Sequence, residues 1–271
     1  MRPFFREAAL IGTKGLTALV VILVGGIVLL QALGEETIPP RTPDECNIAV
    51  VPIVGQITTI DEDNLELFTA SADRIVGDLE RAEKDEQIRG VMVRIDSPGG
   101  NVIASRLVMD AIRRMTKPTV ALIREMGTSG AYLAASGADQ IVAFPDSDVG
   151  SLAVTMSYVQ NAAENEQAGR EYIQLSSGKF KDAGDPNRVL TAEERAIFER
   201  NIDEAHRLLV ETVAENRNVP VASILALADG STMLGTKAKE GGLVDQLGNK
   251  ETAKTWLREK IETDVVYCDV E

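Results

Sequence analysis

The chain has 271 residues, enough for one or two folded domains, and 44% of them are hydrophobic, as in an ordinary globular protein. Its net charge is −14 at pH 7, and an acidic surface repels phosphate, which argues against nucleic acid as a partner. The two cysteines, Cys46 and Cys268, lie far apart in the sequence and lack the spacing of metal ligands. We therefore expect no metal site.

A hydrophobic segment close to the N-terminus predicts a membrane anchor. Residues 16–33 form an uninterrupted run of 18 uncharged residues rich in Val, Leu and Ile, just long enough to span roughly 30 Å of hydrocarbon as a helix. Three basic residues precede this run, and two glutamates follow it. The positive-inside rule then places residues 1–15 in the cytoplasm and the rest of the chain outside it, as in a single-pass protein of the cell membrane.

A cleaved signal peptide is the alternative to this anchor. With Ala32 at the cleavage site, Leu30 would occupy an upstream position that requires a small residue, so the sequence favours an uncleaved helix. Residues 34–46 contain three prolines and form a polar linker, and residues 47–271 form the folded domain. An extracytoplasmic location would permit a disulfide between the two cysteines, but we expect them to remain unpaired.

Strands and helices alternate along the folded domain. Short β-branched apolar runs predict the strands, and apolar residues at helical spacing predict the helices. This alternation indicates an α/β fold with a mostly parallel sheet and right-handed crossovers. The predicted strands are residues 47–54, 90–95, 119–123, 140–144 and 171–176, with an edge strand over 264–270; the predicted helices are residues 71–82, 102–115, 191–216, 221–228, 236–241 and 250–261, with a further short helix ending near residue 137.

Two glycine-rich turns, at residues 99–100 and 127–130, each follow the carboxyl end of a predicted strand. In a parallel sheet such ends meet at one edge, where sites commonly form, so we expect the two turns to lie together. Apolar spacing in the helix after the first turn predicts an inward face made of Val102, Ile103, Leu107, Ala111 and Met115.

Ser129 lies at the second turn, where a buried strand gives way to a helix. Gly127 and Gly130 flank it, and small neighbours allow a backbone or a substrate to come close. The start of a helix supplies unpaired N–H groups and the positive end of a dipole. Ser129 therefore has two interpretations at this stage: an N-cap of the helix, or a nucleophile beside an oxyanion site.

The residue types available to assist a serine are restricted. His206 is the only histidine, and its place beside the apolar stripe of a long helix is typical of an ordinary surface residue, so a Ser-His-Asp triad is not expected. Lysine is the known substitute for histidine as a base, provided that it is neutral. The candidates are Lys179 and Lys181, between which the local sequence does not decide. Gly100 and Gly130 are the natural oxyanion donors.

With these motifs in view, residues 47–261 resemble the signal peptide peptidase A family, serine endopeptidases of the ClpP/crotonase superfamily. Each matching block is weak alone, but six in the same order are specific together. The blocks are residues 95–100 (IDSPGG), 117–118 (KP), 129–132 (SGAY), 149–152 (VGSL), 177–182 (SGKFKD) and 241–248 (GGLVDQLG).

The resemblance implies a ClpP/crotonase-like spiral of βαβ units preceded by one transmembrane helix. It implies Ser129 as nucleophile, Lys181 rather than Lys179 as general base, and Gly99 and Ser151 as residues that line the site. In this family the catalytic pair and the substrate groove are completed between neighbouring protomers, which implies a ring-like or dome-like homo-oligomer. The length resembles the single-domain members.

Together these features predict a membrane-anchored Ser-Lys endopeptidase that needs no cofactor. Its active site would lie outside the cytoplasm, and the resemblance implies remnant signal peptides or other extended apolar segments of membrane proteins as substrates. Two alternatives remain. The first is an acyl-CoA hydratase or isomerase of the crotonase type, against which the anchor and the Ser-Lys pair argue. The second is a non-catalytic scaffold on the same fold.

Overall fold

In the computed structural model, the described residues are 46–60 and 69–268. The chain divides into two compact units, Met1–Thr42 and Pro43–Glu271, and every described residue belongs to the second unit. The predicted membrane segment, residues 16–33, therefore lies outside the described residues, together with nearly all of the predicted linker. Within the described part, no helix combines the length and the hydropathy needed to cross a membrane.

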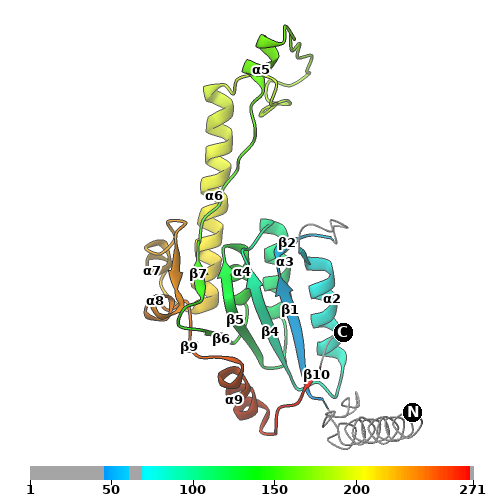
Figure 1. The fold of residues 1–271 in the computed structure, drawn as a ribbon, viewed down its shortest axis with the longest axis vertical. Coiled ribbons are helices and arrows are strands. Elements are labelled where there is room, and N and C mark those ends of the chain that lie inside the picture. Colours follow the sequence, from blue (N-terminus) through cyan, green and yellow to red (C-terminus); the bar gives the residue numbers. More distant parts are fainter. Residues whose placement is uncertain (1–45, 61–68, 269–271) are drawn as a thin grey trace, which may run out of the picture. The chain divides into compact units, whose positions relative to one another are not determined.

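A mostly parallel sheet forms the centre of this unit (Figure 1), as predicted. Its strands run in the order β10-β1-β4-β5-β6-β9, and all neighbours in this series are parallel. β7 pairs in parallel with the end of β5 and antiparallel with β8, while β2 and β3 form a separate parallel pair. The strands are β1 (Ile48–Val54), β2 (Gln56–Thr58), β3 (Thr69–Ser71), β4 (Gly90–Ser97), β5 (Thr119–Thr128), β6 (Gln140–Ala143), β7 (Asp148–Gly150), β8 (Thr232–Leu234), β9 (Gln246–Leu247) and β10 (Tyr267–Cys268).

Helices cover both faces of the sheet because alternate strand residues point to opposite sides. Val93 and Ile123 belong to the apolar cluster that includes α2, α3 and α4, whereas Met92 and Leu122 belong to the cluster that includes α9. The helices are α2 (Ala72–Lys84), α3 (Val102–Arg113), α4 (Gly130–Ala135), α5 (Ala162–Gln167), α6 (Ala192–Arg217), α7 (Val221–Leu225), α8 (Gly235–Glu240) and α9 (Lys250–Ile261).

Two local predictions are wrong. Residues 171–176 form no strand, although their alternating apolar residues have the pattern of one. The inward face of α3 is also rotated: Val102, Ile103 and Leu107 are exposed, and Val108 and Ile112 are among the residues buried instead. The apolar residues at the start of α3 serve a surface of the site, as described below, and the spacing rule cannot distinguish such a surface from the core.

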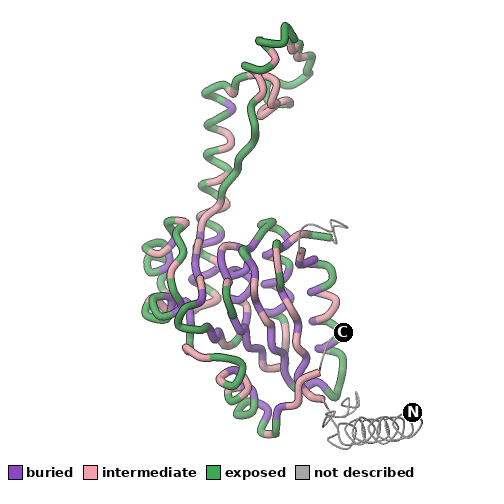
Figure 2. The backbone as a smooth tube through the Cα atoms, viewed as in Figure 1, coloured by how far each residue is buried: buried purple, intermediate pink, exposed green. Residues whose placement is uncertain are grey.

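An arm formed by residues 155–200 extends from the sheet (Figure 1). The C-terminal half of α6 packs on the body through Leu209, Val210 and Val213, all of which are buried. The arm comprises the long connection from β7, the short helix α5 and the first part of α6, and it carries little buried surface (Figure 2). Glu194 is the only residue of the arm that is buried.

Cys46 and Cys268 form a disulfide, so the expectation of two unpaired cysteines is wrong. The physical reason is the pairing of β10 with the first strand of the domain, in which Ala49 lies opposite Cys268. The side chain of Asn47 adds to this junction by donating to the Asp264 carbonyl over 2.8 Å. The beginning and the end of the folded domain are therefore neighbours, which their separation in the sequence did not reveal.

Candidate active site

Ser129 occupies a strained elbow between β5 and α4. Its φ of 53° and ψ of −123° are unusual for a residue with a side chain, and such conformations concentrate at functional sites. Its backbone N–H donates to the Gly150 carbonyl over 2.7 Å, which ties the elbow to the end of β7. The side chain makes no capping hydrogen bond. Ser129 thus stands at the N-cap position without capping, and its hydroxyl is not committed to the helix.

The two glycine-rich turns meet at this elbow, as the parallel sheet predicts. A Cβ atom on Gly99 would lie 2.6 Å from the Gly130 nitrogen and 3.0 Å from Ser129 Cβ. A Cβ atom on Gly130 would lie 2.2 Å from Ser105 Oγ and 3.3 Å from the Gly100 nitrogen. Real Cβ atoms do not approach other atoms to 2.2 Å, so the close contact of the turns requires glycine at both positions.

Two backbone N–H groups, those of Gly100 and Gly130, belong to these adjoining turns. Gly130 is the first residue of α4, so its N–H has no acceptor within the helix. The N–H of Gly100 likewise has no protein acceptor within the described part of the chain. Ile57 holds this turn from the other side, because its carbonyl accepts the Asn101 N–H over 2.9 Å. The two N–H groups predicted as oxyanion donors thus lie at this elbow without a protein acceptor in the described part of the chain.

An apolar cavity of about 200 Å³ opens beside Ser129. The exposed residues at the start of α3 form part of its wall, which explains why their apolar side chains do not face the core. Arg106 is its only charged lining residue in the described part, and its guanidinium donates to Thr212 Oγ1 over 3.1 Å. The lining residues are Gly100, Val102, Ile103, Ser105, Arg106, Ser129, Gly130, Leu133, Ala153, Val154, Ala205, Leu208 and Leu209.

Ser151 lies next to the elbow at the end of β7. Its φ is 52°, and its backbone N–H donates to the Ser231 carbonyl over 2.8 Å. Its hydroxyl donates to the Gly230 carbonyl over 3.1 Å. Since Gly150 accepts the hydrogen bond from Ser129, the structure places Ser151 beside Ser129, and the family resemblance implies that both belong to one site.

The predicted base does not reach this cavity within one chain. Among the described lining residues there is no lysine, histidine or carboxylate. Lys181 lies on the arm, where its side chain is exposed and its backbone N–H donates to the Gly178 carbonyl over 3.1 Å. The alternative lysine, Lys179, pairs with Glu193 over 2.6 Å, whereas Lys181 Nζ has no partner among the described residues.

His206 does not line the cavity beside Ser129 either. It lies on α6, borders a different small cavity together with Val210 and Val221, and is half-buried rather than an ordinary surface residue. Its Nε2 atom is buried without a hydrogen-bond partner in the described part of the chain.

Tyr132 anchors the helix that follows the elbow. Its side chain is completely buried, and its hydroxyl donates to the Leu243 carbonyl over 2.7 Å. Burial raises the pKa of this hydroxyl above its ordinary value, so it remains a neutral donor. This contact ties α4 to the segment around Leu243, and it thereby helps to fix the Ser129 elbow.

A mostly parallel α/β sheet with a serine elbow between glycines is shared by several classes of enzyme, and the comparison with known families decides among them. A model of peptidase family S49 matches residues 111–264, more than half of the chain, and the chain belongs to this family. The resemblance to signal peptide peptidase A proteins is thereby confirmed, since relatives of that name also match.

Three relatives illustrate the match. A Methanocaldococcus jannaschii protein designated a candidate protease is 36% identical over 65% of this chain and 57% of its own length. An Enterococcus faecium protein designated a candidate signal peptide peptidase is 28% identical over 87% of this chain and 70% of its own length. The chloroplastic serine protease SPPA of Arabidopsis thaliana is 29% identical over 70% of this chain and 28% of its own length. The chain therefore corresponds to only part of each relative.

Proposed function

We propose that this chain is a membrane-anchored serine endopeptidase in which Ser129 is the nucleophile and Lys181 the general base. The observation that carries the proposal is the strained Ser129 elbow, whose hydroxyl is free of capping and borders the apolar cavity. The S49 family match supports peptide-bond hydrolysis and argues against the crotonase-type alternative. The name of the Arabidopsis relative supports the serine-type mechanism.

The proposed reaction proceeds in two steps. Ser129 Oγ attacks the peptide carbonyl carbon while its proton passes to neutral Lys181 Nζ, and the N–H groups of Gly100 and Gly130 hold the oxyanion. Collapse of this intermediate expels the amine, which takes the proton from Lys181 and leaves an ester on Ser129. Lys181 then deprotonates a water molecule that attacks the ester, which releases the acid and restores the serine.

We propose that Lys181 reaches Ser129 from a neighbouring copy of the chain. The cavity beside Ser129 has no base among its described lining residues. Lys181 belongs to the arm of residues 155–200, and this arm extends away from the sheet (Figure 1). The arm also exposes large apolar side chains, including Leu175 at 92%, Val159 at 76% and Ile173 at 70% exposure. Contact with another copy would bury these side chains, as expected for a homo-oligomer.

The substrates would be extended apolar peptides. A leucine-sized side chain fits the scale of a 200 Å³ cavity with an apolar lining, and the name of the Enterococcus relative points to signal peptides. The Cys46–Cys268 disulfide supports an extracytoplasmic location for the catalytic domain, because disulfides persist in oxidising compartments. Residues 16–33 would anchor this domain in the cell membrane.

The test uses the full-length chain in detergent, a fluorogenic apolar peptide and a fluorophosphonate probe. Ser129→Ala should abolish both turnover and labelling, and Lys181→Ala should abolish turnover, whereas Lys179→Ala should retain activity. Co-expression of the Ser129→Ala and Lys181→Ala chains should restore part of the activity. In a mixed assembly, Lys181 of the first variant can act on Ser129 of the second. Wild-type turnover by Ser129→Ala would refute the proposal and would favour a non-catalytic scaffold.

A further inference from the structure

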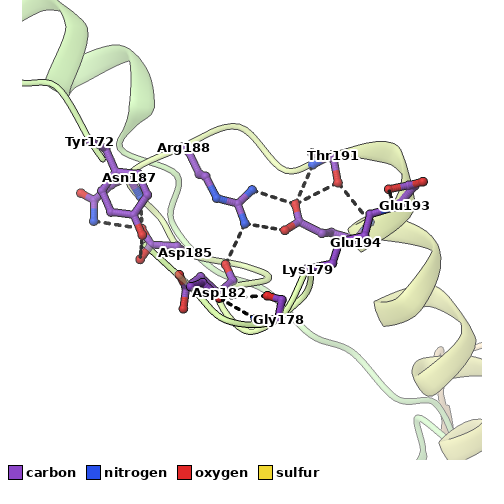
Figure 3. A network of polar contacts seen from close by, with 11 residues as sticks. Tyr172, Gly178, Lys179, Asp182, Asp185, Asn187, Arg188, Thr191, Glu193 and Glu194 are labelled. Atoms are coloured by element: carbon purple, nitrogen blue, oxygen red, sulfur yellow. Dashed lines mark hydrogen bonds and ion pairs between the residues drawn. The ribbon is translucent and has the colours of Figure 1, made fainter. Parts of the chain in front are cut away.

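The loop that carries Lys181 is held by an ion pair between the half-buried Arg188 and Glu194, the only buried residue of the arm (Figure 3). Glu194 is only 3% exposed, and it is the only charged residue in the described part of the chain that is buried. Its carboxylate accepts hydrogen bonds from both terminal nitrogens of Arg188, and the one from Nη1 measures 2.8 Å. We call this pair the Arg188–Glu194 clamp.

The clamp contacts the loop one residue beyond Lys181. Arg188 Nη2, which also pairs with Glu194, donates to the carbonyl oxygen of Asp182 over 2.8 Å. Glu194 in turn accepts hydrogen bonds from the backbone N–H and the hydroxyl of Thr191, each over 3.0 Å. The clamp therefore connects the peptide that follows Lys181 to the first turn of α6 (Figure 3).

A second set of contacts fixes the other end of the loop. The Tyr172 hydroxyl donates to Asp185 Oδ2 over 3.0 Å, and the Asn187 N–H donates to Asp185 Oδ1 over 2.8 Å. The backbone between these fixed points is closed by short turns, with Asp185 N–H donating to the Asp182 carbonyl over 3.1 Å. The loop is thus restrained at Asp182 and at Asp185, while the Lys181 side chain stays exposed and unpaired within the described part of the chain.

A buried ion pair is a weak source of stability, because the cost of desolvation offsets much of the attraction between the charges. An apolar pair could take the place of this attraction in holding the arm together, but it would offer no donor to the Asp182 carbonyl. The geometry fits a different requirement: a catalytic group must be held close to its productive position, and a displacement of about 1 Å can reduce the rate on the order of a hundredfold.

We propose that the Arg188–Glu194 clamp positions Lys181 for proton transfer, so that Arg188 and Glu194 are positioning residues of the peptidase. This inference rests on the proposed function of Lys181. Neither residue need touch the substrate, since both act through the Asp182 carbonyl and the backbone beside it. The same clamp does not hold Lys179, whose ammonium group already pairs with Glu193.

The test replaces both charges at once, because Arg188→Met alone would leave Glu194 buried without its partner. In Arg188→Met/Glu194→Gln, the amide can still accept from Thr191, but the donor to the Asp182 carbonyl is lost. We expect kcat for the fluorogenic peptide to fall about tenfold to a hundredfold, with KM within twofold and an altered pH profile of kcat/KM. The single variant Arg188→Lys should have a kcat between those of the double variant and the wild type, because lysine keeps a positive charge but lacks the forked donors of the guanidinium.

Glu193→Gln is the matched control, since it removes a neighbouring exposed ion pair that does not contact Asp182; it should keep wild-type kcat. Particle size and thermal midpoint are measured for every variant. Wild-type kcat and an unchanged pH profile in the double variant would refute the positioning role of the clamp. A loss of activity that follows dissociation of the assembly would refute it as well. Full activity of Lys181→Ala would instead refute the proposed base, which separates the two failures.

Discussion

The backbone N–H of Ser129 donates to the carbonyl oxygen of Gly150 over 2.7 Å, which joins the proposed nucleophile to the strand that leads to Ser151. This bond holds the elbow in a conformation with φ of 53°, and it lies between two segments that adjoin only because β7 pairs with the end of β5. The strain at Ser129 is therefore maintained by the sheet.

The strained backbone at Ser129 predicts how substitutions at this position change the free energy of unfolding. Because glycine adopts this conformation without a steric penalty, Ser129→Gly should be more stable than Ser129→Ala by about 1 kcal/mol, the lower end of the cost of such strain. Both variants should lack peptidase activity. Urea unfolding of the two proteins checks the difference, and equal midpoints would show that the backbone is relaxed.

Gly130→Ala should impair the site through a collision with α3. The added methyl group would lie 2.2 Å from Ser105 Oγ and 3.0 Å from Ser105 Cβ, so either the elbow or α3 must move. Labelling by the fluorophosphonate probe should slow by roughly tenfold to a hundredfold, and Gly130→Ala/Ser105→Gly should recover part of the rate. Gly77→Ala is the control, because its methyl group would meet only Arg81 Nη1 at 3.5 Å. Unchanged labelling of Gly130→Ala would contradict the close contact.

Filling the cavity should change substrate preference. Ala153 lines the cavity beside Ser129, and Ala153→Leu would occupy part of its 200 Å³ with three added carbon atoms. We expect kcat/KM for peptides with a bulky apolar residue before the cleaved bond to fall at least about tenfold relative to peptides with alanine there. Ala192→Leu, at an exposed position of α6, should leave the ratio unchanged. An unaltered preference in Ala153→Leu would assign the specificity pocket elsewhere.

Low pH should reduce the stability of the arm, because it protonates the Glu194 carboxylate. The hydrogen bonds from Arg188 and from the Thr191 N–H lower the pKa of this carboxyl from 4.5 to about 2. Because the pKa is lower in the folded state, the carboxylate contributes its full stabilisation above about pH 4.5, and this contribution is lost as the pH falls towards 2. The unfolding free energies of wild type and Glu194→Gln, compared between pH 6 and about pH 2, should converge at the acidic end. A constant difference over this range would contradict the low pKa.

The Cys46–Cys268 disulfide should contribute a large part of the domain's free energy of unfolding. It joins residues separated by 222 positions, and closing a loop of that length in the unfolded chain corresponds to about 5 kcal/mol in the chain-entropy estimate. Cys46→Ser/Cys268→Ser should lower the unfolding free energy by an amount of this order while activity below the transition persists. Urea titrations with and without reductant provide the measurement, and an effect below about 1 kcal/mol would show that β10 and Asn47 suffice to hold the ends.

The sequence alone predicted the parts of this protein that depend on local pattern. Helix α9 begins and ends where the apolar spacing predicts, and α6 (Ala192–Arg217) matches the helix predicted over residues 191–216. The meeting of the two glycine turns also followed from the sequence, since carboxyl ends of neighbouring parallel strands share one edge. Ser129, Gly100 and Gly130 could be proposed as site residues for this reason, whereas Gly99 and Ser151 were implied by the family resemblance.

Only the tertiary structure decided features that depend on distant contacts. The disulfide required knowledge that β10 pairs with β1, and the exposed start of α3 required the cavity that it lines. Arg188 carried no sequence signal, because its importance arises from the Asp182 carbonyl that it reaches. The absence of Lys181 from the Ser129 cavity has the same origin: the lysine motif indicates the residue type, whereas the fold of the arm determines where one chain places it.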